Sequence, residues 1–142
     1  MTVYFEDVEV GSDLPELIKE PISATQLIRY SGASGDFNPI HSVPETAQAV
    51  GLDGIIAHGM LIMAFAGQLF TNWAGNGSVR QFKVRFSGMT KPGESVICRG
   101  KISEKVEENG ECIVRGKLTV KGAADDSLKI KGDFAVALPT RR

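Results

Sequence analysis

The architecture of the chain is decided by one central stretch, which reads His58-Gly59-Met60-Leu61-Ile62-Met63-Ala64-Phe65-Ala66-Gly67-Gln68-Leu69-Phe70-Thr71-Asn72-Trp73. Nearly every position from Met60 to Phe70 is apolar, so a helix formed here has almost no polar face. Such a helix has to be buried, and a sheet wrapped around it is the simplest cover. We therefore predict a helix that begins near His58 and Gly59, ends near Trp73 and forms the centre of the core.

The sequence after this helix alternates between apolar and polar side chains, which is typical of β-strands with one buried and one wet face. One long buried helix enclosed by an antiparallel sheet is an α+β architecture of the hot-dog type. The predicted buried faces carry Phe82, Val84 and Phe86 in the first strand; Val96, Cys98, Gly100 and Ile102 in the second; Cys112, Val114, Gly116, Leu118 and Val120 in the third; and Leu128, Ile130, Gly132, Phe134, Val136 and Leu138 in the fourth.

The hairpin between the second and third strands contains the turn dipeptide Asn109-Gly110. A two-residue turn there would place the two apolar stripes on opposite faces of the sheet. We therefore favour a three-residue loop that starts one residue earlier and pairs Val106 with Cys112 and Cys98 with Val120. That register separates the two cysteines by eight residue pairs, roughly 26 Å at ~3.3 Å per residue, which excludes an internal disulfide.

Two shorter helices are predicted before the central one. Ser23-x-x-Gln26 has the pattern of a capping box and starts a helix that is expected to end within residues 31–35. Ser42-x-x-Glu45, with a proline in the first turn, predicts a second short helix that runs to about Gly51.

Residues 1–142 are predicted to form a single domain, because 142 residues of which 42% are hydrophobic suffice to bury one core. The 16 basic and 17 acidic side chains give a net charge of −1, which argues against a dedicated nucleic-acid partner. The apolar run 60–67 is much shorter than the ~20 residues that a membrane span needs. The N-terminus lacks the pattern of a signal peptide, so a cytoplasmic location is expected.

The predicted sheet leaves an edge strand open. Pairing two such edges across a two-fold axis is a natural way to cover them. We therefore expect a dimer, a homodimer in the first place, with a heterodimer as the alternative.

The first of the two histidines lies in the loop Ser34-Gly35-Asp36-Phe37-Asn38-Pro39-Ile40-His41. Asn38-Pro39 favours a turn, so Asp36 and His41 can face each other across a tight loop. A carboxylate and an imidazole placed this way can hold one water, with one group taking its proton while the other delivers or receives a second proton. From residue types alone, the alternative is that Asp36 only caps the loop and His41 is an ordinary packed or solvated residue.

The second histidine, His58, precedes Gly59 at the start of the central helix. The first amides of a helix have no partner within it, and the helix dipole adds partial positive charge there. Because Gly59 has no side chain, a ligand oxygen that gains negative charge during a reaction could approach its N–H closely. The alternatives are that Gly59 only starts the helix and that His58 is structural. The spacing of the two histidines and Asp36 fits no pattern of a metal site, so no metal is expected.

Three segments resemble one known family. Tyr30-Ser31-Gly32-Ala33-Ser34-Gly35-Asp36-Phe37-Asn38-Pro39-Ile40-His41, followed after five residues by Ala47, resembles the hydratase 2 motif of MaoC-like dehydratases. Ala57-His58-Gly59-Met60 resembles the start of the central helix of that family, and Phe5-x-Asp7-Val8-x-Val10-Gly11 resembles the start of a MaoC domain. The chain is also similar to (R)-specific enoyl-CoA hydratases and to the beta-type subunit of two-subunit 3-hydroxyacyl-carrier-protein dehydratases.

The resemblance implies a reversible hydratase that acts on trans-2-enoyl thioesters of CoA or of an acyl-carrier protein. It implies syn addition of water, an (R)-3-hydroxyacyl product and no cofactor. Asp36 and His41 would be the catalytic pair, Asn38 would orient the loop and the water, and the Gly59 N–H would be the oxyanion donor. We also expect substrate contacts from His58, Met60 and Phe37.

One position departs from the family pattern, because some of these hydratases carry a serine nine positions after the landmark histidine, where this chain has Gly67. Three alternatives stay open: a carrier-protein dehydratase of fatty-acid elongation, a non-catalytic hot-dog subunit that binds acyl chains, and a thioesterase. Retention of both Asp36 and His41 speaks against the non-catalytic subunit. If the carrier protein is acidic, three cations on the wet side of one strand would form part of its docking face; they are Arg80, Lys83 and Arg85.

Overall fold

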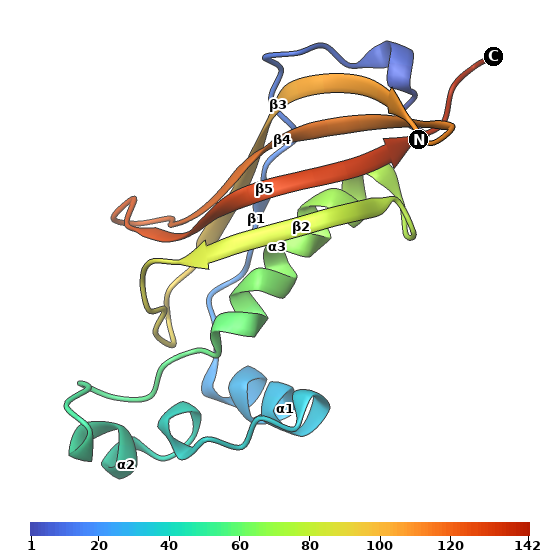
Figure 1. Ribbon diagram of the computed structural model, residues 1–142. Coiled ribbons are helices and arrows are strands. Elements are labelled where there is room, and N and C mark those ends of the chain that lie inside the picture. Colours follow the sequence, from blue (N-terminus) through green and yellow to red (C-terminus); the bar gives the residue numbers. More distant parts are fainter.

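The computed structural model describes all 142 residues and shows an antiparallel five-stranded sheet curled around one long helix (Figure 1). This confirms the predicted α+β hot-dog architecture. The strand order across the sheet is β1-β3-β4-β5-β2. The strands are β1 (Leu17–Ile18), β2 (Val79–Phe86), β3 (Val96–Glu108), β4 (Glu111–Gly122) and β5 (Leu128–Leu138). The helices are α1 (Ala24–Ser34), α2 (Pro44–Ala49) and α3 (Gly59–Ala74), with short 3₁₀ turns η1 (Phe5–Asp7) and η2 (Pro39–His41).

Helix α3 supplies the centre of the core, but one of its sides stays open. The Phe70 ring packs against the rings of Phe82 and Phe134, with centroids 5.4 and 4.5 Å away. Met60 and Ala64, on the other side of the helix, are exposed. The prediction of a helix buried on all sides is therefore wrong for a single chain, because the sheet covers only one side of it. No helix of the chain has both the length and the apolar character that crossing a membrane requires. The buried residues of α3 are Leu61, Ile62, Phe65, Ala66, Leu69 and Phe70.

The turn between β3 and β4 differs from the predicted three-residue loop. Asn109 and Gly110 alone form the turn, with positive φ angles of 51° and 78°, and Glu108 pairs directly with Glu111. Two consecutive residues with positive φ are characteristic of the tight hairpin turns whose twist matches that of the strands.

A β-bulge keeps both apolar stripes on one face in spite of this tight turn. The register of β3 against β4 shifts at Ser103, where one extra residue is inserted in β3. The predicted pairing of Cys98 with Val120 is therefore confirmed, whereas Cys112 lies opposite Glu107, one residue beyond its predicted partner. Both cysteines are free, and burial raises the pKa of the Cys98 thiol to about 12, so this thiol is an inert core group.

The first helix begins as predicted and the second does not. Ser23 Oγ accepts a hydrogen bond from the Gln26 N–H at 3.1 Å, which caps α1. Helix α2 has Val43 as its N-cap and Pro44 as its first residue, and the predicted cap at Ser42 is wrong. Ser42 closes the preceding turn η2 instead, because its N–H donates to the Pro39 carbonyl.

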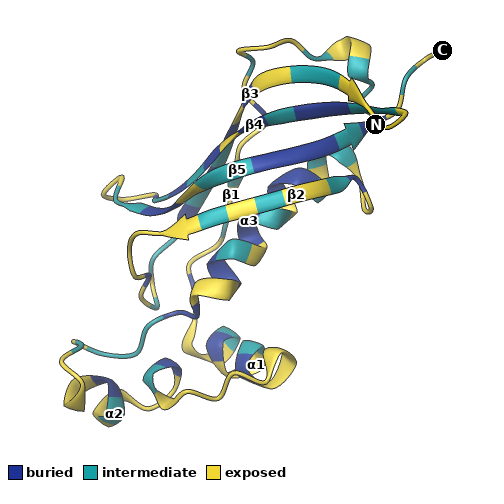
Figure 2. Cartoon of the chain, viewed as in Figure 1, coloured by how far each residue is buried: buried dark blue, intermediate teal, exposed yellow.

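Residues 23–56, which include α1, η2 and α2, form a lobe beyond one end of the sheet (Figure 1). The chain enters and leaves this lobe at the same loop, which connects β2 to β3. The Ile22 N–H donates to the Glu94 carbonyl at 2.9 Å, and the Ala57 N–H donates to the Thr90 carbonyl at 2.7 Å. Most of the lobe is exposed (Figure 2), and its buried residues are Leu27, Ser31, His41 and Ala47.

Candidate active site

Asp36 and His41 face each other in the lobe, between α1 and α2. The carboxylate oxygen Oδ2 of Asp36 lies 3.8 Å from Nε2 of His41. A single water about 2.8 Å from each of these atoms would bridge them with an angle of roughly 85° at its oxygen. The Asp36 side chain is 51% exposed, so water can reach this position from the solvent. The pair therefore has the spacing that shared activation of one water needs.

Local hydrogen bonds shape the loop that carries Asp36. Helix α1 ends at Gly35, whose φ of 76° turns the chain away from the helix axis. Asp36 Oδ1 then accepts from the Asn38 N–H, and Asn38 Oδ1 accepts from the Ile40 N–H, each at 3.2 Å. Asn38 therefore shapes the loop, and its side-chain oxygen caps η2.

His41 is buried, and its ring orientation is fixed by one strong contact. Nδ1 lies 2.7 Å from the Ile56 carbonyl oxygen, which can only accept, so Nδ1 carries the hydrogen and donates. In the neutral ring Nε2 then carries no hydrogen and has a free lone pair, and Nε2 is the atom that faces Asp36. The Ile56 N–H in turn donates to the Ile40 carbonyl at 3.1 Å, which ties the end of the lobe to η2.

His58 supports the pair from inside the protein. Its ring is 1% exposed and stacks on the His41 ring, with centroids 3.9 Å apart. Nε2 of His58 lies 3.1 Å from Ser31 Oγ and 3.3 Å from the Asp36 carbonyl oxygen, so this nitrogen donates. Burial, with His41 alongside, lowers the pKa of His58 and favours a neutral ring. His58 thus holds both members of the pair and offers no exposed surface to a substrate.

The N-terminus of α3 meets the end of β2 at Gly59. Within the helix, the first backbone bonds are those from the Leu61 and Ile62 N–H groups to the His58 carbonyl, so the Gly59 N–H has no partner along the helix. A Cβ atom at Gly59 would lie 3.1 Å from a ring carbon of Phe86. Because glycine has no side chain to fill the space beside the Phe86 ring, the Gly59 N–H stays open to a ligand there.

Large apolar side chains on the segments of the site are exposed. Phe37 in the loop is 69% exposed, Met60 in the first turn of α3 is 57% exposed, and Phe86 at the end of β2 is 49% exposed. Phe37 and Met60 were predicted substrate contacts, whereas the alternation of β2 predicted a buried Phe86. The Phe86 prediction is wrong because β2 extends to the start of α3, where the helix no longer covers it. Gly67, at the position of the family's serine, faces Phe82 of β2, with 3.7 Å between its ideal Cβ and that ring.

The site does not suit a metal ion, although potential ligand atoms of Asp36, His41 and His58 lie within 4.8 Å of one another. The two imidazole rings are stacked with 24° between their planes, so their in-plane lone pairs do not converge on one point. In addition, Nε2 of His58 is engaged as a donor. A bridging water fits this arrangement better than a tetrahedral metal site does.

Comparison with known proteins identifies the family of the chain. Residues 8–123 match the family model of the MaoC like domain. A 3-hydroxybutyryl-CoA dehydratase of Methylorubrum extorquens is 29% identical over 144 residues, covering 98% of this chain and 86% of that protein. An (R)-specific enoyl-CoA hydratase of Rhodospirillum rubrum is 29% identical over 140 residues, covering 97% and 93%. The solved structure of the unliganded R-hydratase PhaJ1 of Pseudomonas aeruginosa matches with a TM-score of 0.84 at 25% identity, covering 99% and 88%. The chain therefore belongs to the MaoC-like dehydratase family.

Proposed function

We propose that this chain is an (R)-specific enoyl-CoA hydratase, which adds water reversibly to trans-2-enoyl-CoA and in the opposite direction dehydrates (R)-3-hydroxyacyl-CoA. The observation that carries the proposal is the 3.8 Å separation of Asp36 Oδ2 and His41 Nε2, next to the N-terminus of α3. The two full-length relatives, a hydratase and a dehydratase, support both directions of this reaction.

In the proposed hydration, one water lies between the carboxylate and the imidazole. Its oxygen forms a bond to Cβ of the enoyl group while one of its O–H bonds breaks and that proton passes to the pair. A proton from the pair reaches Cα, so the pair returns to its starting protonation state, and the second hydrogen of the water remains on the new hydroxyl. Because both groups act from one side, the addition is syn.

Negative charge develops on the thioester oxygen during this step. The Gly59 N–H, at the positive end of the α3 dipole, is the proposed donor to that oxygen. The exposed Met60 and Phe37 side chains are the proposed apolar contacts of the acyl chain, and neutral His58 keeps a second positive charge away from His41. The proposal requires no cofactor.

We further propose that two copies of the chain pair through β2, an edge strand of the sheet. An edge strand presents unpaired N–H and C=O groups, and the open side of α3 lies close to this edge through Gly59 and Phe86. A second copy would cover both features, forming a homodimer. Light scattering at micromolar concentration is expected to give twice the mass of the chain, and a monomer would contradict the proposal.

The enzymatic proposal is tested with a short substrate, trans-2-butenoyl-CoA. We expect loss of the absorbance of the conjugated double bond without release of free CoA, and a 3-hydroxybutyryl product with R configuration on a chiral column. Release of free CoA alone would show a thioesterase. An unchanged substrate, with acyl-CoA binding intact, would instead show a non-catalytic subunit.

A further inference from the structure

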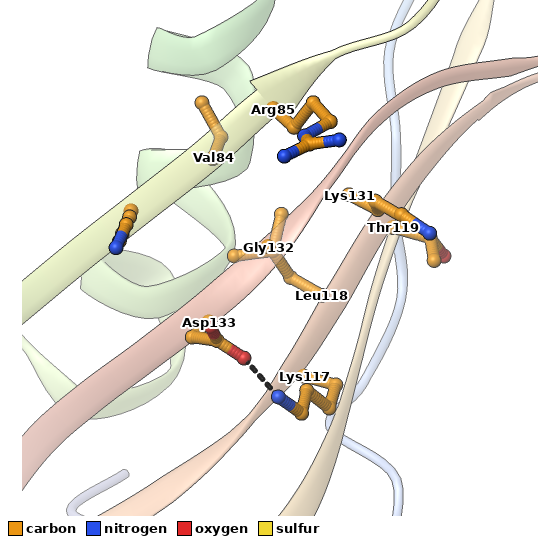
Figure 3. Close-up of a pocket in the computed structure, with 9 residues that line it drawn as sticks. Val84, Arg85, Lys117, Leu118, Thr119, Lys131, Gly132 and Asp133 are labelled. Carbon is orange, nitrogen blue, oxygen red and sulfur yellow. Dashed lines mark hydrogen bonds and ion pairs between the residues drawn. The ribbon is translucent and has the colours of Figure 1, made fainter.

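A shallow groove of about 660 Å³ lies on the face of the sheet that does not pack against α3 (Figure 3). Four of its lining side chains are cationic and one is acidic, which gives the groove a charge of +3 in a chain whose net charge is −1. The cations are Lys83 and Arg85 of β2, Lys117 of β4 and Lys131 of β5, and the acid is Asp133 of β5.

Three of these cations form no ion pair, in contrast to their neighbours, although Lys83 lies opposite Asp133 in the register of the strands. Lys117 is paired with Asp133, whereas Lys83, Arg85 and Lys131 form no ion pair and no side-chain hydrogen bond. Neighbouring strand cations do have such partners: Arg80 pairs with Glu111, Arg99 with Glu16, Lys101 with Asp13, and Lys121 with Asp126.

Arg80, which was expected to project together with Lys83 and Arg85, does not line this groove. Arg80 lies at an irregularity in the register of β2, between Val79 and Gln81, and its guanidinium holds the Glu111 carboxylate through both Nε and Nη2. The unpaired positive charge on this face therefore lies farther along β2 than the sequence suggested.

The pairing of the strands places like charges side by side. Arg85 lies directly opposite Lys131, and Thr119 of β4 lies opposite Lys131 on its other side. Figure 3 shows these three residues along one side of the groove. Two cations directly opposite each other destabilise a sheet, because they repel at short range. An anion bound between them would remove this repulsion, and Thr119 would add a hydroxyl donor.

We propose that this groove binds a ligand that carries two phosphate groups. Lys83 and Arg85 are two residues apart on one strand, about 6.6 Å, so the cations span a length that suits two phosphates better than one. Two phosphate monoesters carry roughly −3 to −4 at neutral pH, which matches the charge of the groove. Arg85 has the planar fork that binds phosphate oxygens in pairs.

A protein partner suits the groove less well. The centre of a protein–protein interface usually contains exposed aromatic or aliphatic anchors. The apolar residues that line this groove are Val84, which is half-buried, and Leu118, which is buried. Two sources supply the required phosphate chemistry, namely the nucleotide end of CoA itself and a separate phosphorylated metabolite.

The binding test uses adenosine 3′,5′-bisphosphate and inorganic pyrophosphate as probes, in calorimetric titrations at about 20 mM salt, where the screening length is roughly 20 Å. The variant is Arg85→Gln/Lys131→Gln, and the matched control is Lys101→Gln, whose cation lies on the same face but is paired. We expect binding by the native chain, a loss of about tenfold or more in the double variant, and no loss in the control. Absence of binding by the native chain, or an equal affinity of the double variant, would overturn the proposal, as would an equal loss in Lys101→Gln.

The double variant removes a like-charge pair, so its melting temperature should not fall. If it does fall, the titration is repeated with Lys83→Gln, which leaves the pair of Arg85 and Lys131 intact.

The source of the phosphates is then decided by enzyme kinetics, and this second experiment rests on the proposed function. A raised KM for trans-2-butenoyl-CoA, with unchanged kcat/KM for the pantetheine thioester that lacks the nucleotide, assigns the groove to CoA. An unchanged KM, with probe binding to the substrate-saturated protein, assigns it to a separate ligand. The binding titration needs no catalysis, so a chain without hydratase activity still tests the groove.

Discussion

A double-mutant cycle on Asp36 and His41 tests whether the two side chains act on one water. Asp36→Asn is close to isosteric and keeps the Oδ1 acceptor that holds the Asn38 N–H. His41→Asn places an amide nitrogen near the position of Nδ1, so the bond to the Ile56 carbonyl can persist while Nε2 is removed. Both variants should therefore fold, and circular dichroism with a thermal melt is the control.

The expected magnitudes follow from the shared water. Loss of a positioned acid or base costs about 10²–10⁴ in rate, so each single variant is expected to lose roughly 10³ in kcat, or about 4 kcal/mol. Two groups that acted independently would lose about 8 kcal/mol together. Because Oδ2 and Nε2 are only 3.8 Å apart and would contact the same water in the proposed mechanism, the double variant is expected to lose about as much as one single variant. The coupling energy is then about 4 kcal/mol.

The assay is the loss of the enoyl chromophore of trans-2-butenoyl-CoA, with kcat measured for all four proteins at saturating substrate. A double variant that lost the product of the two single effects would refute the shared water and leave two separate roles. A single variant with nearly full activity would remove that residue from the chemistry. A variant whose thermal melt had collapsed would be replaced by Asp36→Glu, which keeps the carboxylate and displaces it.

Three further predictions concern the surroundings of the pair. Gly59→Ala should lower kcat/KM by about tenfold or more with an unchanged melting temperature, because the half-exposed Phe86 ring can yield to the new Cβ while access to the N–H narrows; unchanged kinetics would contradict a role for this amide. Lys129→Met should lower the free energy of unfolding by about 2 kcal/mol in urea melts, because the half-buried Glu94 loses its partner at 2.8 Å but can still reach solvent. A change below about 0.5 kcal/mol would show that this ion pair is not stabilising. The pKa of His58 is lowered in the folded chain, so as the pH falls the unfolded chain binds a proton on this ring before the folded chain does. The free energy of unfolding should therefore be level above about pH 6.5 and fall below it, by at most about 1.4 kcal/mol per pH unit from this group. A His58→Asn variant with an equally steep decline between about pH 6.5 and 5.5 would contradict this assignment.

The fold was predictable where local pattern decides it. The apolar run of α3 and the alternation along β3, β4 and β5 can each be read within about fifteen residues, and the structure confirms both. The hairpin prediction is wrong because it assumes an uninterrupted pairing register, which a two-residue turn at Asn109-Gly110 cannot satisfy. A bulge at Ser103 satisfies both demands, since it allows the tight turn and restores the common buried face. No residue pattern in β3 announces that bulge.

The site was predictable in the same limited way. Asp36 and His41 belong to one short motif, so their proximity could be inferred from a turn. The stacking of His58 on His41 joins residues 17 positions apart, and the placement of Phe86 beside Gly59 joins α3 to β2. Such contacts depend on the relative placement of whole elements, which periodicity does not encode. The ion pair of Lys129 and Glu94 cannot be predicted from sequence patterns for the same reason.

The proposed chemistry finally depends on how the lobe is held against the helix, because the lobe carries the pair and the helix carries the oxyanion donor. The lobe returns to the β2–β3 loop through the bond from Ala57 to Thr90, and Ala57 lies two residues before Gly59. The same loop is fixed from the sheet, because Lys129 Nζ donates to the Met89 carbonyl at 2.7 Å. A change at Lys129 therefore reaches the donor amide through two hydrogen bonds and the short chain segments that join them, without touching a reacting group. It follows that Lys129→Met should lower kcat more than it raises KM, since the pair and the donor stay present while their alignment loosens.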